Sequence, residues 1–268
     1  MRTDADELEA QMFEAVALDH YPVGITVILF AVGVVLLCQA IVRRYISNET
    51  LRKAHEVGGY YLTLVGTIYG ILLGLVVFDA MSKFQAAERT VNSEAKSLLA
   101  IYSLSDQFPG VQEPIKGLVR EYVKGVITVE WPLMQRGEIS HKSHDVMLSL
   151  IRLIRTIEPK TQNQQSIYAS LLAETNACWE SRLDRNKVSN FGVPTAEWVV
   201  LLIGATIVIA FTFFFTIESH GIHLAMRGMV TLLIAMSLYL VLLFGAPFSG
   251  DLRVSDKPFR FVEQIVFR

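Results

Sequence analysis

Four long stretches of the sequence lack every ionisable residue. They contain no Asp, Glu, Lys, Arg or His, and they comprise Gly24–Val42, Tyr60–Phe78, Trp198–Ile217 and Gly228–Gly245. A bilayer core about 30 Å thick requires about 20 helical residues. We therefore predict an all-α integral membrane protein with four transmembrane helices. The lack of intramembrane charge argues against proton-coupled transporters and voltage sensors, which place such side chains within the membrane.

Cysteine, net charge and catalytic motifs are also scarce. The two cysteines, Cys38 and Cys178, are far apart and fit neither a metal-binding nor a redox spacing, so a disulfide framework is excluded. The formal net charge of −2 gives no support for nucleic-acid binding. The sequence contains no glycine-rich phosphate loop and no nucleophile elbow. We therefore expect no enzyme, no catalytic residue and no cofactor.

Two histidine pairs have the three-residue spacing that can hold a metal on a helix. They are His141 with His144, and His220 with His223. Neither pair is accompanied by a carboxylate-rich motif. The favoured interpretation is solvated loops or lipid-headgroup contacts, and no metal site is predicted.

The apolar stretches divide the chain into a symmetric order of segments. The predicted segments are an N-terminal tail (1–23), a first transmembrane hairpin (24–78), an insert (79–193), a second hairpin (194–245) and a C-terminal tail (246–268). The insert is long enough to form a domain of its own. The expected fold is thus two plus two membrane helices around an inserted domain.

The insert is expected to be a bundle of four amphipathic helices, because its apolar residues recur in steps of three and four. The first helix ends before the turn at 108–110, and the second stops near Trp131-Pro132, since proline disfavours helix at the residue before it. Ser143 is the expected N-cap of the third helix. The fourth runs from about Gln162 to Asn186.

The second membrane span and the first helix of the insert are not separated by any helix-breaking residue. Neither proline nor glycine occurs between Gly74 and Gln107. We therefore predict one rod-like helix that leaves the membrane and continues into the bundle. The alternative is a turn near Asp79.

Small residues form a periodic face on the second span. Gly66, Gly70 and Gly74 follow one another at four-residue spacing, and Thr63 and Thr67 lie beside them. Such a groove lets another helix approach closely, which matters because lipid-exposed helices gain little from hydrophobic burial. One interpretation is ordinary packing within a subunit. The other is that copies of this helix surround a symmetry axis and that the threonine hydroxyls face a pore.

Asp79 directly follows the second span. In the pore interpretation it forms an acidic ring at the mouth, which favours cations. In the alternative it is a solvated carboxylate that pairs with Lys83 one turn away.

The distribution of basic residues gives a weak indication of orientation. The first link carries Arg43, Arg44, Arg52 and Lys53, whereas the N-terminal tail carries only Arg2. The positive-inside rule then places this link in the cytoplasm. We expect a multi-pass protein of the bacterial inner membrane with its insert on the periplasmic side.

Several motifs, taken in order, resemble the bacterial bestrophin-like domain membrane family. They are "IYGILLGLVVFDAMSKFQAAERTVNSEAKSLLAIYSL", "EYVKGVITVEWPLMQRGE", "SRLDR" and "PFSGDLRVSDKPFRF". The family features map onto Tyr69, Gly74, Glu88, Glu94, Ala95, Glu130, Trp131, Pro132, Arg182, Arg185, Pro247, Phe248 and Gly250. The sequence departs from the family at Gly245-Ala246, where relatives often carry a charge before the Pro-Phe dipeptide.

The resemblance implies kinship with anion channels that assemble as pentamers. Structural or inter-subunit roles are expected for the residues outside the membrane spans. Among these, Glu130 and the pair Arg182 and Arg185 are expected either to form a buried or inter-subunit ion pair or to be separately solvated. The C-terminal tail is expected to extend along the insert or a neighbouring subunit, or simply to lie on the surface.

Together these features predict a homo-oligomeric ion channel, tetrameric or pentameric. Its passive pore is lined by the second span, through Thr63, Gly66, Thr67, Gly70 and Gly74 with Asp79 at the mouth, and is gated through the insert. The expected partners are further copies of the chain, the lipid bilayer and small inorganic ions. The alternative is a non-conducting sensor or scaffold module whose insert binds a ligand or partner.

Overall fold

The structure, a computed structural model, describes residues 19–45, 48–136, 138, 142–190, 192–215 and 220–268. Every element in these ranges is helical, and four helices are long and apolar enough to cross a membrane. The prediction of an all-α protein with four membrane spans is confirmed. Most of the predicted N-terminal tail lies outside the described residues.

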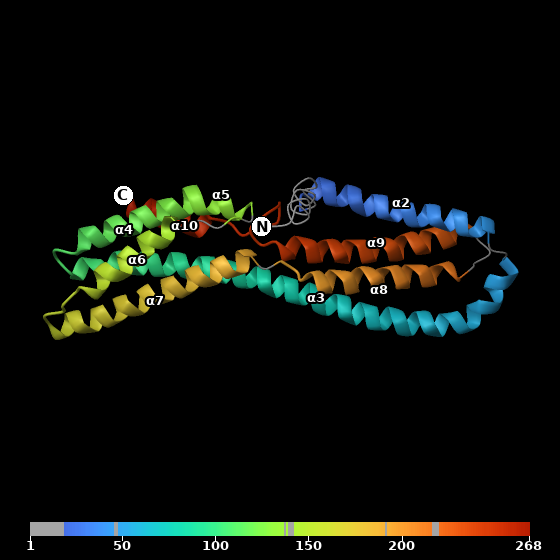
Figure 1. The fold of residues 1–268 in the computed structure, drawn as a ribbon, viewed down its shortest axis with the longest axis horizontal. Coiled ribbons are helices and arrows are strands. Elements are labelled where there is room, and N and C mark those ends of the chain that lie inside the picture. The colour runs from blue at the N-terminus through green and yellow to red at the C-terminus, as the bar shows by residue number, and fades with distance from the viewer. Residues whose placement is uncertain (1–18, 46–47, 137, 139–141, 191, 216–219) are drawn as a thin grey trace, which may run out of the picture. The chain divides into compact units, whose positions relative to one another are not determined.

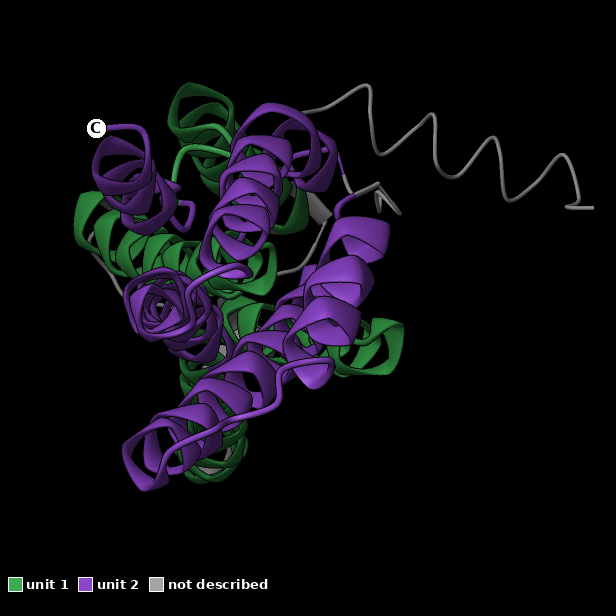
Figure 2. Ribbon diagram, turned by 90° about the vertical axis from the view of Figure 1, so that its left-hand side faces the viewer, with its two compact units in different colours: residues 1–82, 193–246, 250–252 green, residues 83–192, 247–249, 253–268 purple. Residues whose placement is uncertain are grey.

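The chain forms two compact units (Figures 1 and 2). The membrane unit contains the described parts of residues 1–82, 193–246 and 250–252. The insert unit contains those of residues 83–192, 247–249 and 253–268. The insert unit therefore includes most of the C-terminal segment, which the sequence alone had placed in a separate tail, whereas residues 250–252 belong to the membrane unit.

Four helices make up the membrane unit. They are α2 (Tyr21–Tyr45), the first part of α3 (Asn48–Leu104), α8 (Thr195–Phe213) and α9 (His220–Gly245). Figure 1 shows α2, α8 and α9 running alongside one another. The buried core of this unit consists of Tyr69, Leu73, Leu201, Ala205, Val208, Ile234 and Val241.

Helix α3 is continuous over 57 residues. At about 1.5 Å per residue it is about 85 Å long. It begins at Asn48, 12 residues before the apolar stretch at Tyr60. Residues 48–57 contain neither proline nor glycine, and the helix continues through the glycines at 58 and 59. The predicted continuation of the second span into the insert is confirmed, and the alternative of a turn near Asp79 is wrong.

Glycines admit aromatic rings at two helix crossings of the membrane unit. A Cβ atom at Gly204 of α8 would lie 2.5 Å from the ring of Tyr69, whose hydroxyl donates to the carbonyl of Leu201 at 3.2 Å. A Cβ atom at Gly24 of α2 would lie 2.1 Å from the ring of Tyr239 on α9. Both contacts require a residue without a side chain.

The second insert helix does not stop at Trp131-Pro132. Helix α4 (Gln112–Gly125) passes into a π-helical turn, η2 (Val126–Glu130), and then into α5 (Trp131–Met134). The predicted stop is wrong because a π turn, closed by the backbone N–H of Trp131 donating to the carbonyl of Val126, precedes the proline. Pro132 then stands in the first turn of a new α-helical segment, where no backbone donor is required.

The third and fourth insert helices are α6 (Lys142–Arg155) and α7 (Gln162–Asn190). Ser143 does not cap α6. It lies inside the helix, 1% exposed, and its hydroxyl has no hydrogen-bond partner among the described residues. A Cβ atom at Gly125 of α4 would lie 2.8 Å from this hydroxyl, so Ser143 marks a close approach of α4 and α6 instead.

The C-terminal segment forms a helix, α10 (Lys257–Val266), rather than a fully extended tail. Its residues Phe259, Val262 and Val266 are buried in the insert unit. The Nε atom of Arg120 on α4 donates to the carbonyl of Val266 at 2.7 Å, which satisfies a free acceptor at the helix end.

Candidate functional site

Helix α3 carries an exposed line of residues along most of its length, which we call the α3 stripe. It comprises Leu64, Ile68, Ile71, Leu75, Phe78, Ser82, Gln85, Arg89, Asn92, Lys96, Leu99 and Ser103. The members recur in alternating steps of four and three, the spacing that keeps one face of a helix towards a partner helix. All are exposed except Ser82 and Leu99, which are half-buried.

The first five members of the α3 stripe are large apolar residues. Their exposed fractions range from 58% at Leu64 to 65% at Leu75. The opposite face of the same segment packs inside the membrane unit through Tyr69 and Leu73, which are 7% and 8% exposed. The α3 stripe is therefore the face of this span directed away from the other described helices of the membrane unit.

The small residues predicted for the pore lie on a line beside the α3 stripe. Thr63, Thr67, Gly70 and Gly74 each precede a stripe residue by one position, which is about 100° around the helix. Among the described residues, no other part of the chain comes within 4 Å of a Cβ atom placed at Gly66, Gly70 or Gly74. The described part of the chain thus does not use the groove for packing.

The two threonine hydroxyls are turned to their own backbone. That of Thr63 donates to the carbonyl of Gly59 at 3.0 Å, and that of Thr67 donates to the carbonyl of Thr63 at 2.7 Å. The hydroxyl donors of both threonines are therefore satisfied by their own helix, as the lipid core, which offers no hydrogen-bond acceptor, requires. Each oxygen can still accept a hydrogen bond, and the pore-lining role of Thr63 and Thr67 stays a prediction.

Asp79 does not share the face of the glycines. It follows the stripe residue Phe78 by one position, which places it about 100° around the helix on the other side. Asp79 is exposed. The Gly70 line and Asp79 thus flank the α3 stripe on opposite sides.

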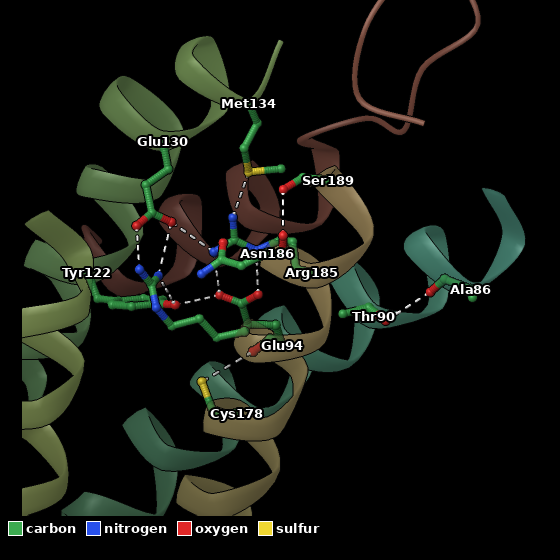
Figure 3. A network of polar contacts seen from close by, with 11 residues as sticks. Ala86, Thr90, Glu94, Tyr122, Glu130, Met134, Cys178, Arg185, Asn186 and Ser189 are labelled. Carbon is green, nitrogen blue, oxygen red and sulfur yellow. Dashed lines mark hydrogen bonds and ion pairs between the residues drawn. The ribbon is translucent and has the colours of Figure 1, made fainter. Parts of the chain in front are cut away.

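A cluster of buried charges joins three helices of the insert unit (Figure 3). Glu94 of α3, Glu130 of the π turn, and Arg182 and Arg185 of α7 are at most 2% exposed. Arg182 binds Glu130 with both terminal nitrogens, at 3.0 and 2.6 Å. The predicted ion pair of Glu130 with the two arginines is thus present as a buried pair within one chain.

Arg185 bridges the two carboxylates of the cluster. Its Nε and Nη2 atoms donate to Glu94 at 2.7 and 3.0 Å, and Nη2 also donates to Glu130 at 2.8 Å. Its Nη1 donates to the sulfur of Met134 at 2.9 Å. Two guanidinium groups and two carboxylates balance in charge, which is the condition for burying them at acceptable cost.

Tyr122 completes the cluster. Its hydroxyl donates to Glu94 and accepts from Arg182 at 2.9 Å. Burial, together with the charge of Glu94, raises the pKa of Tyr122 well above its ordinary value, so the hydroxyl stays protonated as a donor. Burial alone would raise the pKa of Glu130, but the hydrogen bonds and charges of Arg182 and Arg185 outweigh it and lower that pKa.

The inward face of α7 explains why its two arginines meet the cluster. Leu171, Thr175, Cys178, Arg182 and Arg185 are buried and recur in steps of four and three, so they form one line towards α3. The π turn has the corresponding effect on Glu130, because it shifts the register of α4 just before that residue.

The aromatic side chains of the insert unit pack beside the charge cluster. The ring of Trp131 makes edge contacts with Phe248 at 5.7 Å and Phe259 at 5.9 Å between centroids. The guanidinium of Arg185 lies 5.8 Å from the Phe259 ring. Phe248 follows Pro247 in the motif noted in the sequence, so the motif supplies one wall of this packing.

Two residues of the same motif belong to the membrane unit. Gly250 has a φ of +69°, and a Cβ atom there would lie 2.6 Å from that of Asp19, so the position requires glycine. The carboxylate of Asp251 accepts from the backbone N–H of Tyr21 at 2.8 Å and lies 2.9 Å from Nδ1 of His20. It thus caps the start of α2, the first membrane span.

Glu88, which is also among the residues that carry the resemblance to the family, is exposed on α3. It precedes the stripe residue Arg89 by one position, and it therefore lies on the same side of the α3 stripe as Gly70. Glu88 is not part of the buried charge cluster.

The last membrane helix contains ionisable residues, contrary to the prediction. Helix α9 begins eight residues before Gly228, and the candidate span Gly221–Gly245 includes His223 and Arg227, which are 6% and 3% exposed. Arg227 donates to the carbonyl of Thr212 and, at 3.2 Å, to Nε2 of His223. Nδ1 of His223 lies 3.3 Å from the carboxamide of Gln39 on α2.

These contacts also correct the interpretation of the histidine pairs. His223 is a buried member of a polar cluster, not a headgroup contact. The ring centroids of His144 and Trp179 are 5.4 Å apart, and His141 is outside the described residues. No group of three or more potential metal ligands occurs in the described ranges.

Sequence reasoning missed two features of this site. Tyr122 and Met134 were not expected to bind the charges, because nothing in the local sequence shows which distant side chain they meet. The α3 stripe was also missed, although its steps of four and three are readable in the sequence, because the glycines beside it give a more conspicuous pattern.

The fold and these features define a four-span helical membrane protein with an inserted bundle. The model of the Bestrophin-like domain family matches residues 29–259, and the chain belongs to this family. The solved structures similar to it include two variants of a bacterial bestrophin homologue from Klebsiella pneumoniae. One has a TM-score of 0.66 at 13% identity and covers 90% of this chain and 97% of its own.

The other variant has a TM-score of 0.70 at 12% identity and covers 90% of this chain and 99% of its own. At such low identity the likeness shows a common fold. None of the curated proteins compared with the chain has a significant match. The resemblance stated from the sequence motifs is confirmed.

Proposed function

We propose that the chain is a subunit of a homo-oligomeric ion channel, tetrameric or pentameric, whose passive pore is lined by α3. The observation that carries this proposal is the α3 stripe. Five exposed apolar side chains stand at the spacing of a helix seam, on the face opposite to the one that packs within the membrane unit.

A ring of copies accounts for each face of α3. In the proposed ring, the exposed face of α3 opposite to the subunit's own core, the α3 stripe, is directed to the symmetry axis. The line of Thr63, Thr67, Gly70 and Gly74 then lies against the adjacent subunit, where small residues permit close approach. An apolar stripe at the axis supplies a constriction that conducts when it is widened and wetted.

Gating through the insert follows from the continuity of α3. The helix has no break, and its extramembrane part is attached by Glu94 to Arg185 of α7 at 2.7 Å. A ligand or partner that moved the bundle would therefore move α3 with it. The family supports the general class, because bestrophins are anion channels.

The proposed orientation keeps the insert outside the cytoplasm. It rests on the basic link between the first two spans, which carries Arg43 and Arg44. A cysteine introduced at the exposed residue Lys124, in a Cys38→Ser background, should react with a membrane-impermeant maleimide in intact cells. If this cysteine were labelled only after the cells are lysed, the insert would lie in the cytoplasm and the proposed orientation would be wrong.

Flux measurements on the purified full-length protein test the channel proposal. The protein is reconstituted into liposomes at a proven oligomeric state, and fluxes of Na⁺, K⁺ and Cl⁻ are recorded. We expect flux of at least one of these ions. Folded, oligomeric protein that passes none of them would contradict the channel and would favour a non-conducting sensor or scaffold.

Gly70→Leu tests the assembly. The leucine side chain fills the groove, and we expect the oligomer to dissociate in mild detergent, as measured by light scattering coupled to gel filtration. Gly33→Leu is the matched control, because Gly33 lies on another membrane helix with open space around it. Oligomers that survive Gly70→Leu would show that the groove is not a subunit contact.

A further inference from the structure

The α3 stripe changes its chemistry where α3 leaves the membrane span. From Leu64 to Phe78 its members are apolar, whereas from Ser82 onward most are polar or charged. The charged members are Arg89 and Lys96, and both are basic. We propose that these two residues determine which sign of ion enters the pore.

Both side chains are exposed and available to act on ions. Neither Arg89 nor Lys96 belongs to an ion pair among the described residues. By contrast, the carboxylate of Glu94 on the same helix is completely buried and bound to Arg185. Folding has thus removed one acidic group from the solvent-facing surface of α3, on which Arg89 and Lys96 remain together with the exposed Glu88 and Asp79.

The other charges near this segment lie off the α3 stripe. They include Lys83, which follows Ser82 by one position, and Glu174 of α7, whose carboxylate accepts from the hydroxyl of Ser97 at 2.8 Å. Glu88 is one position before Arg89, about 100° around the helix, on the side that carries Gly70. Asp79 is about 100° around on the opposite side. In the proposed ring the carboxylates of Glu88 and Asp79 flank the path, whereas Arg89 and Lys96 point to the axis.

The spacing of the two residues strengthens their effect. They are seven residues apart, so in a ring they form two layers about 10 Å apart along the axis. This is about one Debye length at 0.1 M salt, so the potentials of the layers overlap. A narrow passage lined by one sign of charge raises the local concentration of counter-ions by about tenfold or more.

This inference rests on the proposed function, and it favours anions over the cations that Asp79 alone suggested. It concerns only the sign of the permeant inorganic ion. The arrangement predicts that selectivity is set outside the membrane span, on the polar part of the α3 stripe. The apolar part would then act as the constriction without choosing the sign.

Reversal potentials across a salt gradient test the assignment. The wild-type protein is compared with Arg89→Gln/Lys96→Gln in planar bilayers with a tenfold KCl gradient. We expect the ratio of chloride to potassium permeability to fall by about tenfold or more in the double variant. Lys124→Gln/Arg152→Gln is the matched control, because it removes two exposed cations elsewhere on the insert and should leave the ratio unchanged.

Two further measurements separate the possible failures. The difference between wild type and double variant should shrink in about 1 M salt, where the Debye length is about 3 Å. Arg89→Lys/Lys96→Arg should retain the wild-type ratio, which separates charge from folding. If wild type carries no current, the proposed function fails; if it conducts and the double variant keeps its ratio within twofold, only the assignment of Arg89 and Lys96 fails.

Discussion

Replacing Glu130 by glutamine should open the insert unit. Glu130 accepts hydrogen bonds from Arg182 at 3.0 and 2.6 Å and from Arg185 at 2.8 Å, and it is 2% exposed. Glutamine keeps one acceptor oxygen but places an amide donor against guanidinium donors. It also leaves two buried cations facing the single carboxylate of Glu94.

The expected cost follows from this geometry. Removing one partner of a buried ion pair destabilises a protein by about 3–5 kcal/mol, mainly because the remaining charge is buried without compensation. Since 1.36 kcal/mol corresponds to a factor of ten, the opening equilibrium of the insert should rise between about 150- and 5,000-fold.

Cys178 provides the assay. It is fully buried on α7, and burial raises the pKa of its thiol well above the ordinary value, so it reacts only when the bundle opens. We propose to measure maleimide labelling of Cys178 in a Cys38→Ser background. When reclosing is fast, the labelling rate follows the opening equilibrium and should increase by the same factor.

Two controls make the measurement decisive. Glu121→Gln removes an exposed carboxylate from α4 and should leave the rate within about twofold of the parent. Glu130→Gln/Arg182→Gln restores the balance of one cation, Arg185, with one anion, Glu94, and should label more slowly than Glu130→Gln alone. An acceleration below tenfold in Glu130→Gln would refute the view that this cluster holds the bundle together.

Three other changes should give measurable effects. Gly204→Ala places a Cβ atom 2.5 Å from the Tyr69 ring, and it should lower the detergent melting temperature through a cost of about 1–3 kcal/mol. Phe259→Ala removes a fully buried ring at a cost of about 3–5 kcal/mol, and it should shift Trp131 fluorescence to longer wavelength; an unchanged spectrum would contradict the packing. Because the folded-state pKa of Glu130 lies below its ordinary value of 4.5, its stabilisation is complete above about pH 5 and is lost as pH falls through the lowered value. Acid unfolding followed by fluorescence should show this component in the wild type and not in Glu130→Gln.

The membrane unit and the α3 rod were predictable because they depend on local properties of the chain. A run of about 20 apolar residues fixes a membrane helix wherever it occurs. The absence of proline or glycine between Gly74 and Gln107 was sufficient to predict one helix. The predicted end of a helix at Trp131-Pro132 was wrong because a π turn precedes the proline, which then stands in the first turn of α5. A π turn has no simple sequence signature.

The sequence by itself determined the number of spans, the continuity of α3 and the alternating steps of its exposed stripe, since each is set by residues near one another in the chain. The tertiary structure alone decided which charges are buried and which face solvent. Glu94 and Arg89 lie five positions apart on one helix, yet α7 covers the first and leaves the second exposed. The free energy of an ionised group depends on the partners that fold around it, and those come from distant parts of the sequence.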